Sequence, residues 1–367
     1  MNKNDRVSPA RVTQKQIAAL AAVHRTTVCL ALSDSPRIPA ATKKRVLKIA
    51  RELGYRPDPM LSALAVYRKS NSPVSYRATI GWISHKEGTY DFRKRPQYLH
   101  YYQGAKRRAA SLGYNLEVFE FGSELTTPKR LSQILRARGI AGLLVAPPAG
   151  MSIELPLDWQ HFSAVTFGYA LQKPALHTVA AAHYRDTKRA TQELLKRGYR
   201  RLGLVIRIRT DERCDNNIHA AFLVECVRAG VDISIPPLFD FEFEECSALK
   251  QWIQDHRPDG IVTASPGLVG ALRRLGVNTP AEVGVACLSQ IQEPGAPAGI
   301  SGIVENGEQI GVKAVDTLVS LMHHNERGIP EVAMRIHLEG NWQEGKTVRS
   351  PSEPRKKVLS TSPSKEV

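Results

Sequence analysis

Short apolar segments alternate with longer amphipathic segments along most of this chain, and this alternation most restricts how it can fold. Apolar runs such as Ala78–Ile83 and Gly142–Ala146 are followed by segments with helical spacing, such as Tyr98–Leu112 and Tyr184–Lys196. Buried strands that alternate with helices predict an α/β fold, with parallel sheets flanked by helices on both faces. Because such strands are joined by right-handed crossovers, about 270 residues of this pattern predict two subdomains.

A different pattern precedes this body. Thr13-Gln14-Lys15-Gln16 has the form of a capping box, which predicts that a helix begins after Thr13. Residues 21–23 form a tight turn before a second short helix, Arg25–Leu32, and Gly54 is suited to end a third helix. Three short helices with such a turn predict an all-α helix-turn-helix domain at the N-terminus.

Positive charge is concentrated in the same N-terminal segment. Residues 1–77 hold 15 Lys and Arg against 4 Asp and Glu, a net charge of +11, whereas residues 78–348 carry only +2. A basic segment attracts nucleic acid or an anionic membrane surface, and a merely solubilising arm is the alternative. The second helix of such a unit fits the major groove of DNA, with Arg25 and Thr26 at base edges and Thr27 near a phosphate.

The sequence lacks the signals of membrane, metal and catalytic chemistry. It has no run of about 18 apolar residues, and its start lacks the apolar run of a secretory signal. Five cysteines without a Cys-x-x-Cys pair argue against a disulfide framework and a zinc site, and they fit a reducing cytoplasm. The common hydrolase, phosphate-loop and zinc-protease motifs are missing. We therefore expect a cytoplasmic protein without enzymatic activity, metal or cofactor.

Four groups of N-terminal residues have a characteristic spacing: Val12-Thr13-x3-Ile17-Ala18, Val23-x3-Thr27-Val28, Leu53-Gly54-Tyr55-x-Pro57 and Leu64. Together they resemble the DNA-binding headpiece and hinge of the LacI/GalR transcriptional regulators. The resemblance implies that Arg25, Thr26 and Leu30 face bases and that Leu64 is a wedge in the minor groove. We expect contacts with the DNA backbone from Thr13, Thr27, Tyr55 and Arg56.

Three positions depart from the usual pattern of that family. His24 stands where the family usually has Ser, Cys29-Leu30 stands for Ser-Arg, and Asp58 replaces Asn. Leu30 cannot donate hydrogen bonds to guanine, although it can touch a thymine methyl group. We interpret these departures as an altered target sequence and not as a loss of DNA binding, because the basic charge remains.

The resemblance continues through the body, to about residue 346. It is carried by Tyr102-Gln103-Gly104, Arg197-Gly198-Tyr199, Thr279-Pro280 and residues 304–311. It implies two lobes like those of periplasmic sugar-binding proteins. Ligands of such folds bind beyond the carboxyl ends of the strands, which lie at the cleft between the lobes. The residues that we expect to bind an effector there are His85, Tyr98, Tyr101, Phe167, Tyr169, Asp211, Arg213, Ser265 and Gln290.

The side chains with which the family usually binds sugars are not evident. Residues 287–290, Cys-Leu-Ser-Gln, stand in place of Gly-Phe-Asp-Asp, and Ser265-Pro266 stands in place of Asn-Asp. Ile218 occupies the position of an expected arginine, for which the nearby Arg213 is a candidate substitute. The ligand is therefore left open: a carbohydrate, a different small molecule, or none.

These observations divide the chain into five parts. They are a disordered N-terminus at 1–11, the helix-turn-helix domain at 12–58, a hinge helix and linker at 59–75, the two-lobed effector-binding and dimerisation domain at 76–346, and a disordered basic tail at 347–367.

The predicted function is that of a sequence-specific transcriptional regulator, with repression as the expected effect. It acts as a homodimer on a pseudo-palindromic double-stranded DNA operator, is controlled by a small molecule in the cleft, and has no membrane partner. Two alternatives remain: a solute-binding protein of a transporter, and an enzyme with a nucleic-acid-binding appendage. The first leaves the basic N-terminal segment unexplained, and the second lacks a catalytic constellation.

Overall fold

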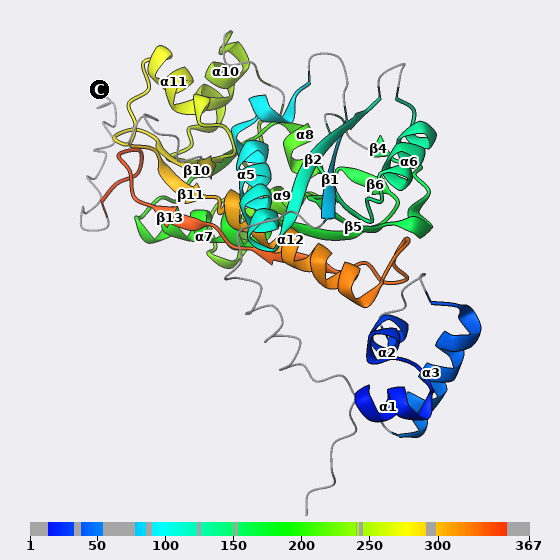
Figure 1. Ribbon diagram of the computed structural model, residues 1–367. Coiled ribbons are helices and arrows are strands. Elements are labelled where there is room, and N and C mark those ends of the chain that lie inside the picture. The colour runs from blue at the N-terminus through cyan, green and yellow to red at the C-terminus, as the bar shows by residue number, and fades with distance from the viewer. Residues whose placement is uncertain are drawn as a thin grey trace, which may run out of the picture.

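The computed structural model describes residues 14–32, 38–53, 78–85, 90–122, 126–148, 150, 153–239, 241, 245–290 and 299–350. They form a small helical unit near the N-terminus and two α/β lobes (Figure 1). Some sequence predictions fall outside the described residues: the segments at 1–11 and 59–75, most of the tail, and the contacts assigned to Thr13, Tyr55, Arg56 and Leu64.

The N-terminal unit consists of α1 Gln14–Leu20, α2 Arg25–Leu32 and α3 Ala40–Glu52. Its small core contains Ile17, Val28 and Val46, all fully buried. The turn between α1 and α2 has a left-handed residue, Ala22, at φ 49°, and the amide of Val23 donates to the carbonyl oxygen of Ala18 at 3.0 Å. The predicted helix-turn-helix fold is therefore confirmed.

The first lobe, which we call the N-lobe, contains a parallel sheet. In spatial order its strands are β12 Arg335–Leu338, β7 His177–Ala181, β5 Ser163–Phe167, β3 Gly142–Val145, β1 Ala78–His85 and β2 Tyr114–Phe121. Helices α5 Pro96–Ser111 and α12 Gly307–His324 cover one face, and α6 Pro128–Ala137 covers the other. Short elements complete this lobe: η1 Phe92–Lys94, β4 Ile153–Glu154, η2 Trp159–His161 and β6 Leu171–Lys173.

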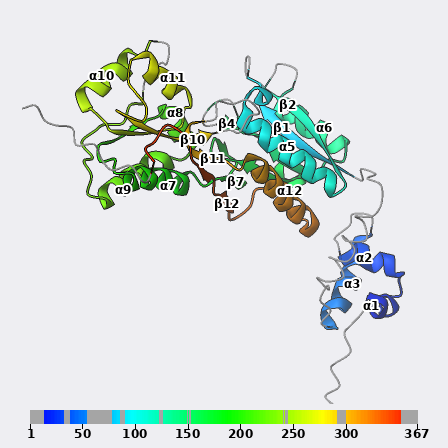
Figure 2. The same cartoon turned by 90° about the vertical axis from the view of Figure 1, so that its left-hand side faces the viewer.

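The second lobe, the C-lobe, also has a sheet between two layers of helices (Figure 2). The strand order is β13 Asn341–Gln343, β11 Ser301–Val304, β10 Gly284–Gln290, β9 Gly260–Thr263 and β8 Leu202–Val205. Its helices are α7 His183–Lys196, α8 Ile208–Arg213, α9 Asn217–Arg228, α10 Ser247–His256 and α11 Gly267–Arg274. The parallel arrangement that the sequence predicts is kept except at β13, which pairs antiparallel with β11.

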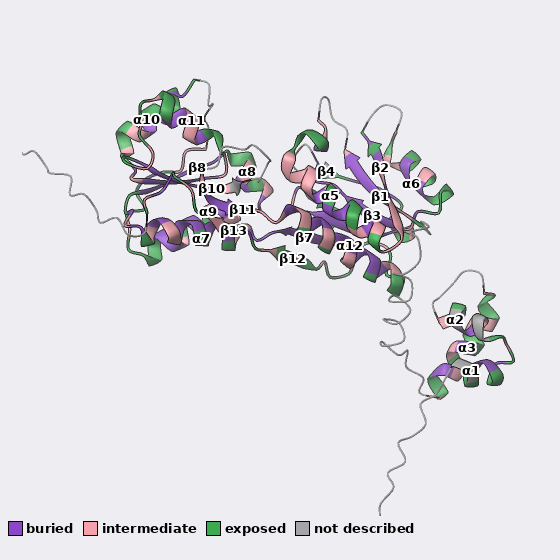
Figure 3. Cartoon of the chain, turned by 60° about the vertical axis from the view of Figure 1, so that its left-hand side comes forward, coloured by how far each residue is buried: buried purple, intermediate pink, exposed green. Residues whose placement is uncertain are grey.

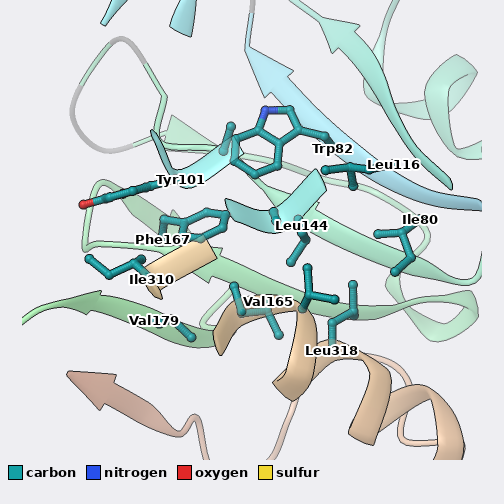
Figure 4. Close-up of a cluster of buried hydrophobic side chains, with 14 of the residues drawn as sticks. Ile80, Trp82, Tyr101, Leu116, Leu144, Val165, Phe167, Val179, Ile310 and Leu318 are labelled. Atoms are coloured by element: carbon teal, nitrogen blue, oxygen red, sulfur yellow. The ribbon is translucent and has the colours of Figure 1, made fainter. Parts of the chain in front are cut away.

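The cores lie on both faces of each sheet, as the alternation of strands and helices predicts (Figure 3). Adjacent residues of β3 show the two faces, since Leu144 joins the core under α5 and α12 whereas Leu143 joins the core under α6. The core under α5 and α12 contains Trp82, Val165 and Phe167 in one continuous cluster (Figure 4).

The C-lobe extends beyond the predicted boundary at residue 346. Thr347 is buried, and its hydroxyl donates to the carbonyl oxygen of Val285 at 2.7 Å and accepts from the amide of Ser301 at 2.8 Å. Val348 packs in the core of the lobe. Residues 347 and 348 therefore belong to the folded body and correct the predicted start of the tail, because their side chains close one end of the sheet.

The chain crosses between the lobes three times, after β7, after β11 and after β12. These crossings hold one another: the amide of Gly340 donates to Asp186 Oδ1 at 2.9 Å, and Asn306 Nδ2 donates to the carbonyl oxygen of Glu339 at 2.7 Å. The amide of Ala182 donates to the carbonyl oxygen of Leu338 at 2.8 Å. The two lobes are therefore joined by a bundle of short, mutually bonded segments, which suits a hinge.

No helix in the described part of the chain is both long enough and apolar enough to cross a lipid bilayer.

Candidate functional site

A cavity of about 430 Å³ lies between the two lobes. The carboxyl ends of the N-lobe strands contribute Pro147 after β3, Gly168 after β5 and Ala181 at the end of β7. The C-lobe strands contribute Ala264 after β9 and Leu288 in β10. Parallel strands place all these ends along one edge of each sheet, so the cleft lies where ligands of open α/β sheets bind.

Aromatic rings form the N-lobe wall of this cleft. Tyr101 of α5 stacks on Phe167 at the end of β5, with ring centroids 5.4 Å apart and planes at 29°. Trp82 packs against Phe167, with ring centroids 5.3 Å apart. The hydroxyl group of Tyr101 points away from the apolar cluster (Figure 4), and burial raises its pKa well above the usual range. The wall therefore offers flat apolar faces with polar tips, which suit a small polyhydroxylated or aromatic ligand.

Glu305 lies where the chain crosses from β11 to α12, and among the described residues of the cleft lining it is the acidic one. Its two carboxylate oxygens accept hydrogen bonds from Tyr101 Oη and Gln97 Nε2, both at 2.5 Å. Burial raises the pKa of Glu305 to about 7, although both hydrogen bonds favour the charged form. This carboxyl group therefore titrates close to neutral pH, so that the charge of the cleft changes with pH in this range.

Arg213 connects the lobes across the cleft. It ends α8 of the C-lobe, and its guanidinium group donates to Tyr98 Oη at 2.7 Å and to the carbonyl oxygen of Gly150 at 3.0 Å, both in the N-lobe. Asp211 positions the corner between α8 and α9, because its Oδ1 accepts from the amides of Ile218 and His219 at 3.2 and 3.1 Å. Within the sequence Asp211-Glu212-Arg213, Asp211 therefore stabilises the fold and Arg213 lines the cleft.

His183 begins α7 at the base of the cleft. Burial, together with the smaller effect of the nearby His337, lowers its pKa to about 4. The imidazole of His183 is therefore neutral at physiological pH, so that it offers the cleft one donor and one acceptor but no charge.

The N-terminal unit exposes both apolar and basic side chains. Leu30 of α2 is 36% exposed, while its neighbour Ala31 is buried in the small core. Thr27 is half-buried in the first turn of α2, and Lys44 and Arg45 on α3 are exposed. The side chains of Arg25 and Thr26 lie outside the described residues, so their predicted base contacts stay predictions.

Three family models match successive parts of the chain. The model for bacterial regulatory proteins of the lacI family matches residues 13–58. The model for periplasmic binding proteins and the sugar-binding domain of the LacI family matches residues 84–233, and one for a periplasmic binding protein-like domain matches residues 191–339. The chain belongs to the LacI/GalR family. It is thus a DNA-binding transcriptional regulator with a periplasmic-binding-protein-like body.

Other members of the LacI/GalR family are similar over nearly the whole length. The HTH-type transcriptional repressor PurR of Aliivibrio salmonicida is 23% identical over 88% of this chain and 98% of its own. The ribose operon repressor of Haemophilus influenzae is 21% identical over 84% of this chain and 91% of its own.

Solved structures of family members share the fold. The complex of the transcriptional regulator CelR with cellobiose has a TM-score of 0.58 and 19% identity, covering 92% of this chain and 100% of that chain. The Lac repressor dimer bound to operator and the anti-inducer ONPF has a TM-score of 0.55 and 16% identity, covering 93% and 100%.

The structure of this LacI-family body brings five of the nine predicted effector residues together. They are Tyr98, Tyr101, Phe167, Tyr169 and Arg213, which line the cleft from both lobes.

Three others lie outside the lining. His85 packs its ring against Phe121, with centroids 4.8 Å apart, because the last side chain of β1 points to the α6 face. Asp211 is only 1% exposed and holds the α8–α9 corner. The amide of Ser265 donates to Thr263 Oγ1 at 3.1 Å, in the turn that leads to α11. The side chain of Gln290 lies outside the described residues.

The sequence reasoning missed several lining residues of the cleft. Gln97 and Arg95 precede the predicted start of the first body helix, whereas α5 begins at Pro96, a residue suited to the first turn. Glu305 falls within residues 304–311, which the family resemblance places at a crossing between the lobes. That resemblance is the one sequence feature that could have indicated its place in the cleft. His183 follows β7, a strand that the apolar pattern does not predict.

Proposed function

We propose that this protein is a transcriptional repressor, which binds its operator as a homodimer and responds to a small molecule in the cleft. Support comes from the cleft itself, because its lining is shared between two lobes that are joined by three short crossings. A ligand that touches both lobes favours one angle between them. Such a change at the crossings is the means by which a ligand and the operator influence each other's binding.

The names of family members support the repressor assignment and the ligand class. PurR of Aliivibrio salmonicida and the ribose operon repressor are named as repressors, and the solved structures hold cellobiose, ONPG and ONPF. A carbohydrate or a related polyhydroxylated molecule is therefore the first ligand to test, and a cavity of about 430 Å³ has the size for a small sugar.

We further propose that the protein is not a catalyst and acts in the cytoplasm, at the nucleoid. The similar proteins named as repressors support this proposal. The domain boundaries at 12–58 and 59–75 and the DNA contacts of Arg25, Thr26, Leu30 and Leu64 belong to this proposal.

Selection of bound duplexes from a random DNA library tests the function. We expect the full-length protein to enrich one pseudo-palindrome at about 150 mM salt, where nonspecific phosphate binding is weak. On that operator, Arg25→Ala should lower the affinity by about tenfold or more, since a base contact is worth about 1–3 kcal/mol.

A matched pair of changes separates specific from general effects. Leu64→Ala should lower affinity for the selected operator, because the wedge that bends DNA is lost. Exposed Lys48, which pairs with Glu52 at 3.8 Å, offers a control, and Lys48→Gln should change affinity less than Arg25→Ala. Unchanged affinity in both Arg25→Ala and Leu64→Ala would refute the proposed DNA contacts.

A further inference from the structure

We propose that the ligand of the cleft is an anion, in which a carboxylate or phosphate group is held between Arg95 of the N-lobe and Arg213 of the C-lobe. This inference rests on the proposed function, since it assigns a chemical class to the small molecule that the cleft takes. Both arginines line the cavity. Both act on the same group, because their positive charges each lower the pKa of the Tyr90 hydroxyl, which burial and Tyr98 raise.

The charges of the lining favour an anion. Arginine keeps its proton in proteins, so Arg95 and Arg213 contribute two permanent positive charges. Against them stands Glu305, whose pKa of about 7 leaves it only partly ionised at neutral pH. His183 adds no charge, because its pKa is lowered to about 4. Among the lining residues that the structure describes, the balance of charge is therefore positive at neutral pH, in a body whose overall charge is close to neutral.

The hydrogen bonds of Glu305 and Arg213 hold both side chains against the N-lobe. Glu305 is directed to the N-lobe, since each carboxylate oxygen accepts from a side chain of α5. Arg213 directs two of its N–H groups to neutral oxygens, those of Tyr98 and Gly150. Among the described residues no carboxylate forms an ion pair with Arg95, whereas the neighbouring Arg93 pairs with Asp91 at 3.2 Å.

Two long helices add to the attraction. Helix α5 has 16 residues and begins at the cleft with Arg95 as its N-cap, and helix α7 has 14 residues and begins there with Ala182 as its N-cap. Neither N-cap side chain accepts a hydrogen bond from the first turn. The N-terminal N–H groups of a helix carry partial positive charge and stabilise nearby anions.

An anion in this position explains how binding would close the lobes. Arg95 belongs to the N-lobe and Arg213 to the C-lobe, and both line the cavity. A carboxylate or phosphate between them accepts charge-assisted hydrogen bonds from both lobes, and such bonds are stronger than those to neutral oxygens. The ligand therefore stabilises the closed arrangement through its charge as well as through its shape.

Matched neutral and anionic ligands test the inference on the full-length protein. Calorimetric titration with hexoses, the corresponding hexuronates and aldonates, and hexose 6-phosphates compares one carbon skeleton with and without the charge. We expect at least one anionic member to bind at least tenfold more tightly than its neutral parent. Hexuronates and phosphates are separate arms, so the result also shows which anionic group is held.

Variants connect the effect to the two arginines. Arg95→Gln and Arg213→Gln should each lower the affinity for the best anion at least tenfold and change that for a neutral sugar much less. Lys94→Gln is the matched control, since Lys94 is exposed, lies next to Arg95 and does not line the cavity. Circular dichroism and operator binding without ligand check that each variant is folded.

The outcomes separate this inference from the proposed function. Three results would overturn the proposal that the ligand is an anion: binding of neutral members alone, binding of no anion in the series, or equal losses of affinity in Lys94→Gln and Arg95→Gln. A bound ligand that leaves operator affinity unchanged would instead overturn control through the cleft. Failure to enrich any operator would overturn the proposed function as a sequence-specific regulator, whatever the cleft binds.

Discussion

At the scale of single residues, the chemistry of the cleft depends on buried groups whose protonation differs from that of free side chains. Glu305 faces Tyr101 and Gln97 on α5, and Asp186 raises its pKa from α7. Burial also raises the pKa of Asp186 itself, to about 6. The carboxyl groups near the crossings are thus held in an environment that disfavours their charged form.

This environment predicts how stability changes with pH. The pKa of Glu305 is about 7 in the folded state against the ordinary value of 4.5, so the folded state binds more protons between these values. The contribution of Glu305 to the free energy of unfolding is therefore greatest below pH 4.5 and falls as the pH rises through 7. Glu305→Gln should be relatively more stable at pH 8 than at pH 5.5, as measured by urea unfolding.

A second carboxyl group, that of Glu308 in the first turn of α12, provides the control. The Arg107 guanidinium beside Glu308 holds the pKa of that carboxyl below its usual range. Glu308→Gln should therefore lack the relative gain in stability at high pH. Asp186 and His183 remain in both variants, so their own titrations cancel in the comparison. If the free energies of unfolding of the two variants changed equally with pH, this would count against the raised pKa of Glu305.

At the scale of elements, α5 and α12 approach each other so closely that side chains are excluded from the contact. A Cβ atom at Gly104 would lie 2.0 Å from the carbonyl oxygen of Glu308, and one at Gly311 would lie 2.0 Å from that of Tyr101. Arg108 and Asp316 join the same helices by an ion pair of 2.6 Å. This packing matters for function, because α5 carries Gln97, Tyr98 and Tyr101 into the cleft.

Substitution of these glycines should separate the two helices. Gly311→Ala places a methyl group against backbone that cannot move aside, so we expect it to lower the free energy of unfolding by about 1–3 kcal/mol. Gly270 in α11 is the matched control, because only Arg274 Nη1, at 3.8 Å, lies near its Cβ position. Gly270→Ala should be neutral or stabilise by up to about 1 kcal/mol, since alanine favours helix. Urea unfolding curves measure both changes.

At the scale of the whole molecule, the function depends on the angle between two lobes that share one chain in three crossings. Asp186, Asn306 and Gly340 tie these crossings together, while Arg213 spans the open side of the cleft. A body held at the crossings and bridged across its open side can change its lobe angle when the bridge changes.

Removal of one acceptor from this bridge should favour a more open body. Tyr98→Phe keeps the aromatic ring but removes the hydroxyl group that accepts from Arg213. We expect a larger radius of gyration by small-angle X-ray scattering in the absence of ligand. Tyr102→Phe on the same helix is the control, because the ring of Tyr102 packs within the N-lobe against Trp82 and Phe92. Identical scattering of Tyr98→Phe and the unaltered protein would contradict the role of the bridge.

The sequence by itself determined the helix-turn-helix unit, the α/β body and the general place of the cleft. These follow from local rules, because apolar periodicity decides strand or helix and parallel strands put their carboxyl ends along one edge. Tyr101 and Phe167 were found in this way, since α5 and β5 end or begin at that edge. The basic segment at 1–77 and its spaced motifs determined the family.

Only the tertiary structure decided which side chains meet in the cleft. Glu305 contacts Gln97 and Tyr101 although about 200 residues separate them in the chain, and no local pattern predicts such a pairing. His85 ends a strand at the correct edge but points to the opposite face, because side chains alternate along a strand. Arg95 and Arg213 likewise line one cavity only because the crossings bring two separately folded lobes together.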